Sequence, residues 1–341
     1  MAYTSINSPT DYFNAKLYTG NGSTQSITGV GFQPDWVWIK DRNNITNHMV
    51  FDSVRSTGKE LHTQNADSET TQANTLTTFG SDGFSLGSNS DVNNSSQNFV
   101  SWNWLAGGTA SSNSNGSITS SVSTNTTSGF SIVSYTGAGG NQTVGHGLGV
   151  VPSVIIVKAR STGGDWTSYH STLGNTKFLR LNSTIAAATQ STYWQDTDPT
   201  SSVFSVGNAG DVNTSSGTHI AYCFAEKKGF SKFGSYTGNG NADGTFVYTG
   251  FSPSFVIVKK TNATGNWVMF DNKRNTFNVV DKRLASNLGD DEGISDRLDF
   301  LSNGWKFRST ATNVNGSDSF IYMAFAESPF TTSTGVPTTA R

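Results

Sequence analysis

The chain has 341 residues and a formal net charge of −2, and charged residues make up 13% of it, about half of the roughly 25% found in an average domain. A nucleic-acid-binding protein needs clustered Lys and Arg to displace counterions from phosphates, and the 22 basic residues here are scattered. Nucleic acid is therefore excluded as a partner. No apolar run approaches the roughly 20 residues that cross a bilayer, so we also expect no membrane insertion.

Hydrophobic residues reach 34% and aromatic residues 12% of the chain, which favours a folded protein over a disordered one. Cys223 is the single cysteine, so neither an intramolecular disulfide nor a cysteine-based zinc site can form. We therefore expect a fold held by packing alone, without metal or cofactor. The polar start, residues 1–9, lacks the basic and apolar regions of a signal peptide, which predicts synthesis and retention in a cytoplasm.

Self-similarity is the strongest signal in the sequence. A Tyr-Thr-Gly block, a Pro-containing block that ends in Lys, and an aromatic closing block recur three times, in the same order and at near-constant spacing. The copies are 17–22 (LYTGNG), 134–139 (SYTGAG) and 235–240 (SYTGNG), then 31–40 (GFQPDWVWIK), 149–158 (GVVPSVIIVK) and 250–259 (GFSPSFVIVK), then 99–104 (FVSWNW), 220–226 (IAYCFAE) and 321–327 (IYMAFAE). This pattern predicts three tandem homologous domains.

The segments between and around the repeats have a different composition. Residues 106–116 are rich in Gly, Ser and Asn, which is typical of a linker, and the two ends are rich in Pro, Thr and Ser, which suggests extended arms that order only against a partner. The predicted order is an N-terminal arm at 1–15, repeat 1 at 16–107, repeat 2 with its linker and edge strand at 108–228, repeat 3 at 229–327 and a C-terminal arm at 328–341.

Within each repeat, apolar and polar residues alternate with a period of two. Examples are 36–40 and 130–135, which are bounded by Gly, Asn and Ser turns. Helical signals are confined to 53–62 and 184–190, which are too short to form helices without tertiary packing. We therefore predict an all-β fold class, with three antiparallel β-sandwich domains of jelly-roll-like topology and flexible terminal arms.

Residue patterns that carry catalysis are missing from the sequence. It has no Gly-x-Ser-x-Gly elbow and no phosphate-binding Gly-Lys-Ser/Thr loop. None of the five histidines has another at metal-ligand spacing: His48, His62, His146, His170 and His219. A Ser/His/Asp triad has no supporting pattern. We therefore predict no catalytic residue, no metal ligand and no enzyme.

Two acidic clusters are candidate sites. Asp196 and Asp198 follow Tyr193 and Trp194, and aromatic rings beside short polar side chains can bind sugar faces; the alternative is that Trp194 is buried between domains. We add Trp166 and His170 of a predicted strand to these four. The predicted glycan contacts are therefore Trp166, His170, Tyr193, Trp194, Asp196 and Asp198. The second cluster, 290–292 with Asp296, favours a solvated loop over a Ca²⁺ site or an acid pair.

Taken together, the three repeated blocks and the ending at 326–330 (AESPF) resemble a family of repeat-containing virion structural proteins of tailed bacteriophages, many of them marine or cyanobacterial. The resemblance runs from residue 11 to residue 341. It implies membership in a virus particle and brings no catalytic residues. Repeat 1 departs from the pattern, because Trp102-Asn103-Trp104 stands where the other repeats have Phe-Ala-Glu, which suggests a different interface.

These observations together predict a non-enzymatic virion structural protein, most favourably a tail-associated fibre or adhesion component that contacts the host surface. We expect its partners to be other virion proteins and a host surface glycan, and its role suggests a homotrimer. We expect it to assemble in the host cytoplasm and to lie on the particle surface. The alternatives are a capsid decoration protein whose two arms clamp capsomers, and a polysaccharide-binding or depolymerase tail protein.

Overall fold

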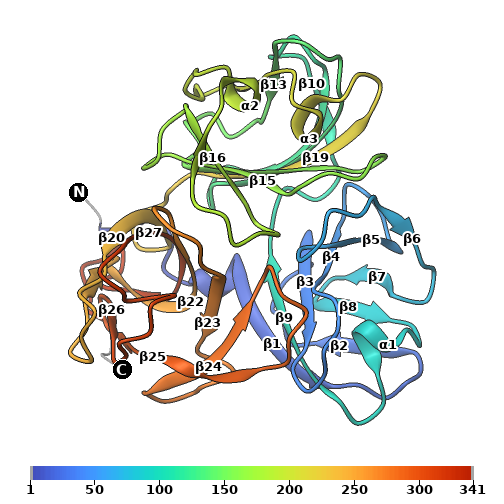
Figure 1. The fold of residues 1–341 in the computed structure, drawn as a ribbon. Helices are drawn as coiled ribbons and strands as arrows, with labels where there is room; N and C mark the ends of the chain where they lie inside the picture. The colour runs from blue at the N-terminus through green and yellow to red at the C-terminus, as the bar shows by residue number, and fades with distance from the viewer. Residues whose placement is uncertain (1–2, 339–341) are drawn as a thin grey trace.

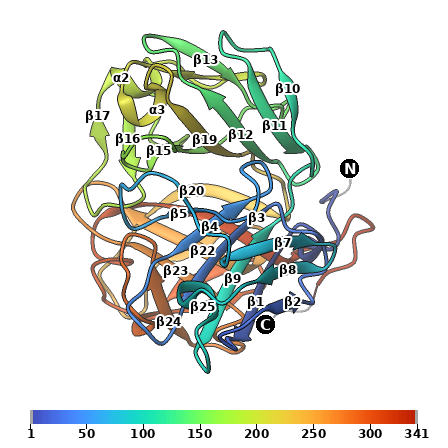
Figure 2. The same cartoon turned by 90° about the vertical axis from the view of Figure 1, so that its right-hand side faces the viewer.

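The computed structural model describes residues 3–338 and is an all-β protein, with 44% of its residues in strands and 4% in helices. Three groups of strands lie around a common centre in Figure 1, with repeat 1 in blue and teal, repeat 2 in green and yellow, and repeat 3 in orange and red. In the view turned by 90°, repeat 2 lies above the other two (Figure 2). The predicted all-β class is confirmed.

Repeat 1 forms a main sheet of order β1-β9-β3-β4-β5-β6 and a smaller sheet of order β2-β8-β7. Its elements are η1 (Pro9–Asp11), β1 (Phe13–Thr19), β2 (Gln25–Thr28), β3 (Trp36–Asp41), β4 (Met49–Asp52), β5 (Lys59–His62), β6 (Thr70–Thr71), β7 (Leu76–Gly80), β8 (Gly83–Leu86), α1 (Ser90–Asn93) and β9 (Asn98–Trp104).

Repeat 2 forms a main sheet of order β10-β11-β12-β19-β14-β15-β16-β17 and the pair β13-β18. Its elements are β10 (Ser111–Asn113), β11 (Ser120–Asn125), β12 (Phe130–Thr136), β13 (Gln142–Gly145), β14 (Val154–Ala159), β15 (Thr167–His170), β16 (Lys177–Arg180), β17 (Ala188–Thr189), α2 (Ser191–Trp194), β18 (Val203–Val206), α3 (Gly210–Asn213) and β19 (Thr218–Phe224).

Repeat 3 forms one eight-stranded sheet of order β20-β27-β22-β23-β24-β25-β26-β21. Its elements are β20 (Ser231–Thr237), β21 (Phe246–Tyr248), β22 (Phe251–Lys260), β23 (Trp267–Asp271), β24 (Val280–Ala285), β25 (Gly293–Leu301), β26 (Gly304–Phe307) and β27 (Ser319–Pro329).

The three repeats share one strand order. In each main sheet the closing strand lies between the first strand and the strand that holds the Pro-block lysine, and a hairpin then continues outward. The matching runs are β1-β9-β3-β4-β5, β12-β19-β14-β15-β16 and β20-β27-β22-β23-β24. The pairs that the closing strand makes in these runs are all antiparallel. The sequence repeat is therefore also a structural repeat.

The Tyr-Thr-Gly block fastens each repeat to its own second half. Its tyrosine hydroxyl donates a hydrogen bond to a valine carbonyl just before the closing strand: Tyr18 to Val92 (2.7 Å), Tyr135 to Val212 (2.6 Å) and Tyr236 to Val314 (2.6 Å). The side-chain oxygen of the asparagine after each valine accepts a hydrogen bond from the backbone amide that follows the glycine of the block: Asn93 from Asn21, Asn213 from Ala138 and Asn315 from Asn239. Burial of all three tyrosines raises their pKa well above the usual value, so the hydroxyls remain donors.

The glycine of this block is required by close packing, and this yields a first prediction. A Cβ added to Gly137 would overlap the carbonyl oxygen of Thr214, a backbone atom that cannot move away alone. We expect Gly137→Ala to lower the free energy of unfolding by about 1–3 kcal/mol, measured by urea denaturation. Gly80→Ala is the matched control, because its Cβ would make only ordinary contacts; equal losses in the two variants would contradict this explanation.

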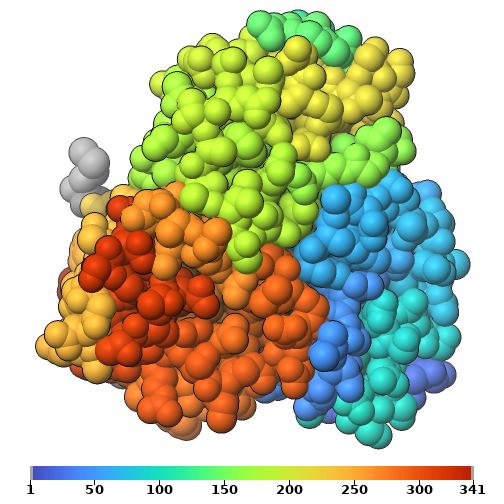
Figure 3. All heavy atoms as spheres, viewed as in Figure 1, coloured from blue at the N-terminus to red at the C-terminus, as the bar shows by residue number. Residues whose placement is uncertain are grey.

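One hydrophobic core joins all three repeats. It contains Trp36 and Trp102 of repeat 1, Tyr222 of repeat 2, and Phe255 and Phe325 of repeat 3 in a single cluster. Three further clusters form a separate core within each repeat. In Figure 3 the surfaces of the three repeats meet along continuous seams on the visible face. The repeats therefore pack as one body.

Contacts between repeats run in a closed ring, from repeat 1 to 2, from 2 to 3 and from 3 to 1. In each case the last residue of the strand that follows the Pro-block strand, namely β4, β15 or β23, reaches the closing strand of the next repeat. The three contacts are Tyr222 hydroxyl to Asp52 carboxylate (2.7 Å), His170 Nε2 with the Tyr322 carbonyl (3.2 Å), and Trp102 Nε1 to Asp271 carboxylate (3.1 Å). Equivalent strands thus meet in cyclic order, which defines an approximate threefold arrangement within one chain.

A second set of contacts runs in the opposite direction around the ring. The Trp166 indole of repeat 2 donates to the His62 carbonyl of repeat 1 at 2.8 Å, and the Trp267 indole of repeat 3 donates to the Arg180 carbonyl of repeat 2 at 2.9 Å. His48 holds the equivalent position in repeat 1, where burial is the main cause that lowers its pKa well below the usual range. Each repeat is therefore fixed from both sides.

Two of the three interfaces carry buried ion pairs. Between repeats 1 and 2, the fully buried Arg55 binds Asp52, and Glu69 binds both Arg55 and Arg160. Between repeats 3 and 1, the corresponding set is Asp271, Arg274, Glu292 and Arg42. At the interface of repeats 2 and 3 the corresponding residues are His170, Leu173, Ala187 and Thr261. Among these four, the Ala187 amide donates a backbone hydrogen bond to the Thr261 carbonyl at 2.8 Å. These four side chains therefore do not form the ionic network of the other two interfaces.

The terminal segments differ from the flexible arms that we predicted. Ile6 is 2% exposed and belongs to the shared core, Phe13 begins strand β1, and the Tyr3 hydroxyl donates to the Gly250 carbonyl of repeat 3 at 2.6 Å. At the other end, the Asn7 amide donates to the Ser333 hydroxyl at 2.8 Å. Burial of apolar side chains against repeat 3 explains this order, so the prediction of flexible arms is wrong for residues 3–15.

The predicted linker also packs against the repeats. The fully buried carboxylate of Asp35 in repeat 1 accepts hydrogen bonds from the backbone amides of Ala106 (2.8 Å) and Gly108 (3.2 Å) at the start of this segment. Farther along, Ser111–Asn113 forms the edge strand β10 beside β11. Repeat 1 is therefore tied directly to repeat 2 rather than separated from it by a free segment.

Candidate functional site

Four of the six predicted glycan contacts are buried in two different cores, on opposite faces of the repeat 2 sheet. Trp166 and His170 point to the core shared by the three repeats, where they are 0% and 2% exposed. Tyr193 and Trp194 belong to α2 and to the separate core of repeat 2. The structure therefore brings Tyr193, Trp194 and the two aspartates together but places Trp166 and His170 elsewhere.

Burial removes the aromatic rings from any sugar. Tyr193 is 4% exposed and stacks on Phe178 with ring centroids 4.0 Å apart, and Trp194 is 2% exposed and packs edge-on against Tyr169 at 5.9 Å. Stacking on a sugar needs an open ring face, which these side chains do not have. The prediction of glycan contacts at Trp166, His170, Tyr193 and Trp194 is therefore corrected: they are packing residues. Trp194 is buried within repeat 2, and not between domains as the alternative interpretation held.

The two aspartates of this cluster are exposed and lie on the loop after α2. Asp198 approaches Tyr169, whose pKa is raised to about 12, chiefly by burial and further by the charge of Asp198. Asp196 adopts a left-handed backbone with φ of 48°. These carboxylates lie at the end of a turn without an exposed ring beside them in the cluster, so the predicted site is reduced to two surface charges.

The second acidic cluster is divided between two roles. Asp290 and Asp291 are both exposed, as a solvated loop requires. Glu292 is instead drawn into the interface of repeats 3 and 1, where it accepts two hydrogen bonds from Arg42, each of 2.8 Å. Asp296 lies apart, paired with Arg283 at 3.2 Å. The four acidic residues therefore do not gather into one site: two lie on the surface loop, one in a repeat interface and one beside Arg283.

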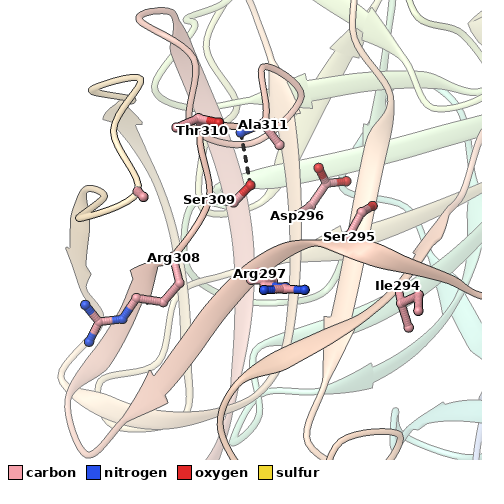
Figure 4. A pocket seen from close by; sticks show the side chains of 9 residues that line it. Ile294, Ser295, Asp296, Arg297, Arg308, Ser309, Thr310 and Ala311 are labelled. Carbon is pink, nitrogen blue, oxygen red and sulfur yellow. Dashed lines mark hydrogen bonds between the residues drawn. The ribbon is translucent and has the colours of Figure 1, made fainter.

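A shallow cavity of about 450 Å³ in repeat 3 gathers accessible polar side chains (Figure 4). Its lining residues are Ala242, Ile294, Ser295, Asp296, Arg297, Arg308, Ser309, Thr310 and Ala311. Asp296 and Ser295 come from strand β25, and the facing wall is the loop after β26, where the Ser309 hydroxyl accepts from the Ala311 amide at 3.0 Å. Arg308 extends away from Asp296 in Figure 4 and binds Asp299 at 2.6 Å.

Asp296 is the chemically distinctive residue of this cavity. Its backbone is left-handed, with φ of 59°, its side chain is 8% exposed, and burial raises its pKa while Arg283 opposes that rise. Hydroxyl groups and one carboxylate around an open hollow can hydrogen-bond a polyol. The lining holds one carboxylate, whereas glycoside hydrolysis ordinarily uses two. The cavity therefore suits weak polar binding rather than cleavage of a polysaccharide.

Three buried lysines are nucleophilic candidates at equivalent positions of the three repeats. Lys40, Lys158 and Lys259 are each 0% exposed, and burial lowers the pKa of each to about 8. Their ammonium groups donate to main-chain carbonyls; Lys158, for example, binds the Gly164 carbonyl at 2.9 Å and the Ala66 carbonyl of repeat 1 at 3.2 Å. These lysines therefore fasten loops and face no substrate.

An exposed aromatic patch was missed by the sequence analysis. Phe246 and Tyr248 of strand β21 are 44% and 53% exposed, and Phe330 is 39% exposed. Tyr3 lies between the ends of this patch, with its ring 6.3 Å from that of Phe330 and its hydroxyl near Tyr248. The available signal was that the β21 segment has an aromatic residue on each side of Val247, where the equivalent segments of repeats 1 and 2 have Ser, Thr or Gly.

The buried histidines predict how stability depends on pH. The His170 pKa is lowered from 6.5 to about 4, because burial disfavours the charged ring. The unfolded chain therefore binds more protons than the folded chain between about pH 6.5 and 4, so stability is full above pH 6.5 and falls as the pH drops through this range. His48, His146 and His219 shift in the same direction.

We expect the urea midpoint to fall steadily between about pH 6.5 and about pH 4.5, and His170→Gln to make that fall shallower. Ile45→Ala is the control, because Ile45 is 79% exposed and has no titratable group, so it should leave the slope unchanged. A midpoint that stays constant over this range would contradict the assignment of neutral buried rings.

Two features are absent from residues 3–338. No group of three or more His, Cys, Asp or Glu side chains lies close enough to hold a metal ion. No helix in this part of the chain is long and apolar enough to cross a membrane.

Comparison with protein families gives one match. A family model described as a domain of unknown function, DUF7483, matches residues 8–329. The chain belongs to this family. The DUF7483 model spans all three repeats as a single unit, which agrees with the core that joins them. No curated protein and no solved structure matches the chain.

Proposed function

We propose that this DUF7483 protein is a non-enzymatic structural component of a bacteriophage particle, most favourably a tail-associated fibre or adhesion component. The observation that carries the proposal is the continuous core through all three repeats, closed by contacts that run in a ring. A building block of a particle must resist force and dilution without a bound ligand. The shared core and the two buried ionic interfaces provide that rigidity without disulfides.

The surface chemistry supports the same role. The described polar cavity is shallow and has a single carboxylate, and the polar candidates of repeat 2 lie around buried rings. Contact with a host glycan is therefore assigned, within this proposal, to the open cavity at Asp296 and not to the residues predicted from the sequence.

The finer fold assignment also belongs to the proposal. We propose that each repeat is a jelly-roll-like sandwich. Two pairings support this: the first, closing and third strands are neighbours, as in β1-β9-β3, and the second strand pairs with the strand before the closing one, as in β2-β8. The hairpin from β3 to β4 continues the same sheet, where a standard jelly roll would pass to the other sheet.

A capsid decoration protein is the second candidate, and the approximate threefold arrangement of repeats favours it. A single chain of this shape offers three similar faces around one axis, which matches a threefold position in a shell. The clamping arms predicted for this role are not available in residues 3–15, which pack on repeat 3. The homotrimer expected from a fibre role stays a prediction.

Immunogold labelling of intact particles separates these functions. Antibody raised against the whole purified chain is applied to particles whose genome encodes it, with particles from a deletion strain as the control. We expect gold on the tail. Gold spread over the head would replace the adhesion proposal with the decoration protein, and purified particles that contain no antigen in a denaturing blot would overturn the virion role itself.

A further inference from the structure

One sheet edge in repeat 3 lies open where its equivalent in repeat 2 is covered. The second strand of each repeat, β2, β13 or β21, lies at the edge of its sheet. In repeat 2 the chain itself covers that edge: Ile118 forms a parallel bridge to Val144, and its amide donates to the Thr143 carbonyl at 3.0 Å. Within the described residues, β21 has only β26 as a partner strand.

The open edge carries exposed aromatic side chains. β21 pairs Phe246 with Lys306 and Tyr248 with Gly304, which leaves both rings on the outer face while Val247 points into the core. The equivalent edge strand of repeat 1 has Ser26 and Thr28 at these positions. Residues 235–250, gold in Figure 3, protrude at the left margin of the molecule. This segment is therefore reachable by another molecule.

The sequence of this edge reads nearly the same in both directions. Residues 244–250 are Gly-Thr-Phe-Val-Tyr-Thr-Gly, centred on Val247. When two such strands pair antiparallel about Val247, each Phe246 meets a Tyr248 of the other copy, each Thr245 meets a Thr249, and glycine meets glycine. Cross-strand aromatic pairs and Thr–Thr pairs are among the favourable combinations in antiparallel sheets. The segment is thus complementary to itself.

The edge also lacks the usual protection against pairing. Exposed edge strands are commonly guarded by a charged residue or a proline, and residues 244–252 contain neither. The edge of β13 is covered by residues 116–118, which belong to the long segment that precedes repeat 2. The junction that precedes repeat 3 has only three residues, 226–228, and is too short to provide a similar covering segment. Repeat 3 therefore has no segment of its own at the matching place among the described residues.

We propose that two copies of this chain associate through antiparallel pairing of their β21 strands, about a twofold axis at Val247. The pairing joins the outer strands β25, β26 and β21 of the two copies into one continuous sheet. Tyr3, Phe330 and Lys228 flank the end of the strand, where the Lys228 ammonium lies 4.5 Å from the Tyr3 ring centre, and they extend the contact beyond the backbone. This inference does not depend on the virion role.

The pairing is short, because β21 contains three residues. Stable complexes bury about 1,200 Å² or more in total, and a three-residue ladder with its neighbouring side chains lies at the lower end of that scale. We therefore expect a reversible dimer with a dissociation constant in roughly the micromolar range. Sedimentation velocity of the full chain from roughly 1 to 100 µM should show the weight-average sedimentation coefficient rising from monomer to dimer.

Three variants test the register. Phe246→Glu places a charge on the edge and faces Lys306 within its own sheet, so the monomer should fold while dimerisation weakens at least about tenfold. Tyr248→Lys should do the same. Mixing the two variants should restore dimers, because the carboxylate introduced in one copy then meets the ammonium introduced in the other. Ile45→Lys, at a side chain that is 79% exposed in repeat 1, is the control and should leave dimerisation unchanged.

The outcomes decide the proposal. A wild-type chain that stays monomeric at every concentration overturns it, as does a trimer or an association that Phe246→Glu leaves intact. Near-ultraviolet circular dichroism of each variant confirms that the monomer is folded. Loss of dimers in the single variants with recovery in the mixture supports the antiparallel pairing and cannot arise from misfolding of either variant.

Discussion

Asp271→Ala is expected to lower the free energy of unfolding by about 3–5 kcal/mol, because it removes the nearer of the two carboxylates, Asp271 and Glu292, that pair with the buried Arg274. Arg274 is 0% exposed at its side chain and binds Asp271 at 2.6 Å. The same carboxylate accepts the Trp102 indole hydrogen bond from repeat 1, and the Arg274 guanidinium lies 5.6 Å from the Trp102 ring centre. One substitution therefore weakens both the repeat 3 core and its contact with repeat 1. Urea denaturation at about pH 7.5, above the range in which the buried histidines change stability, measures the loss.

A matched control separates this buried pair from ordinary surface charges. Asp243 is 78% exposed and also pairs with a cation, Lys306, at 2.6 Å. Surface ion pairs contribute about 0–1 kcal/mol, so Asp243→Ala should change stability much less than Asp271→Ala. Replacing both members of the buried pair, Asp271→Leu with Arg274→Leu, should lose less than Asp271→Ala alone. A double variant that is less stable than Asp271→Ala would contradict the explanation by charge.

Trp36→Ala is expected to lower the free energy of unfolding by a similar amount, about 3–5 kcal/mol, through loss of packing instead of charge. Its ring lies 4.3 Å from that of Trp104 within repeat 1 and 4.5 Å from that of Tyr222 in repeat 2, measured between centroids. Trp36 is 2% exposed, so the truncated side chain leaves a cavity at the interface of two repeats that neighbouring rings cannot refill. Urea denaturation under the same conditions measures the loss.

The control for Trp36 is an exposed apolar residue. Ile45 follows β3 on the surface and is 79% exposed, so Ile45→Ala should alter stability by no more than about 0.5 kcal/mol. Trp36→Phe keeps most of the ring area and should lose less than Trp36→Ala. If Trp36→Ala were as mild as Ile45→Ala, the shared core would not contribute to stability in the way described.

Much of the fold could be predicted because the repeated residues make contacts that depend on their own local chemistry. The Tyr-Thr-Gly block recurs because each copy needs a hydroxyl that reaches a valine carbonyl and a glycine where the backbone passes close. Alternation with a period of two identified strands such as β3 and β12, since one face of a strand packs inward. The single cysteine, Cys223, is buried and unpaired, as a fold without disulfides requires.

The arrangement of the repeats could not be predicted from one sequence. Contacts such as Trp166 with the His62 carbonyl join residues more than a hundred positions apart, and nothing local marks them. The ring closure also explains the largest error at the site. Trp166 was grouped with polar residues as a sugar contact, but both faces of a sheet are buried when its repeat packs against two neighbours. Where an aromatic residue stands close to an aspartate here, the ring belongs to the core and the aspartate to a surface turn, so the two do not form a binding face.

The strand register corrects the comparison of the closing blocks: Trp102-Asn103-Trp104 stands at the positions of residues 222–224 and 323–325, and not at those of Phe-Ala-Glu. Trp102 occupies the position of Tyr222 and Met323 in the other closing strands, and it provides the donor for Asp271. Trp104 packs against Phe13 at 4.8 Å and against Phe255 of repeat 3 at 6.0 Å. The different interface suggested for this segment stays a prediction, because Phe224 and Phe325, at the position of Trp104, lie in the same shared core.

Differential scanning calorimetry of the intact chain tests most directly the claim that three repeats form one body. We predict one unfolding transition whose calorimetric enthalpy equals its van't Hoff enthalpy, because the shared core and the ring of contacts cannot be lost from one repeat alone. Asp271→Ala should move this whole transition to lower temperature. Two or three separate transitions, or a transition in which Asp271→Ala moves only one component, would contradict the account.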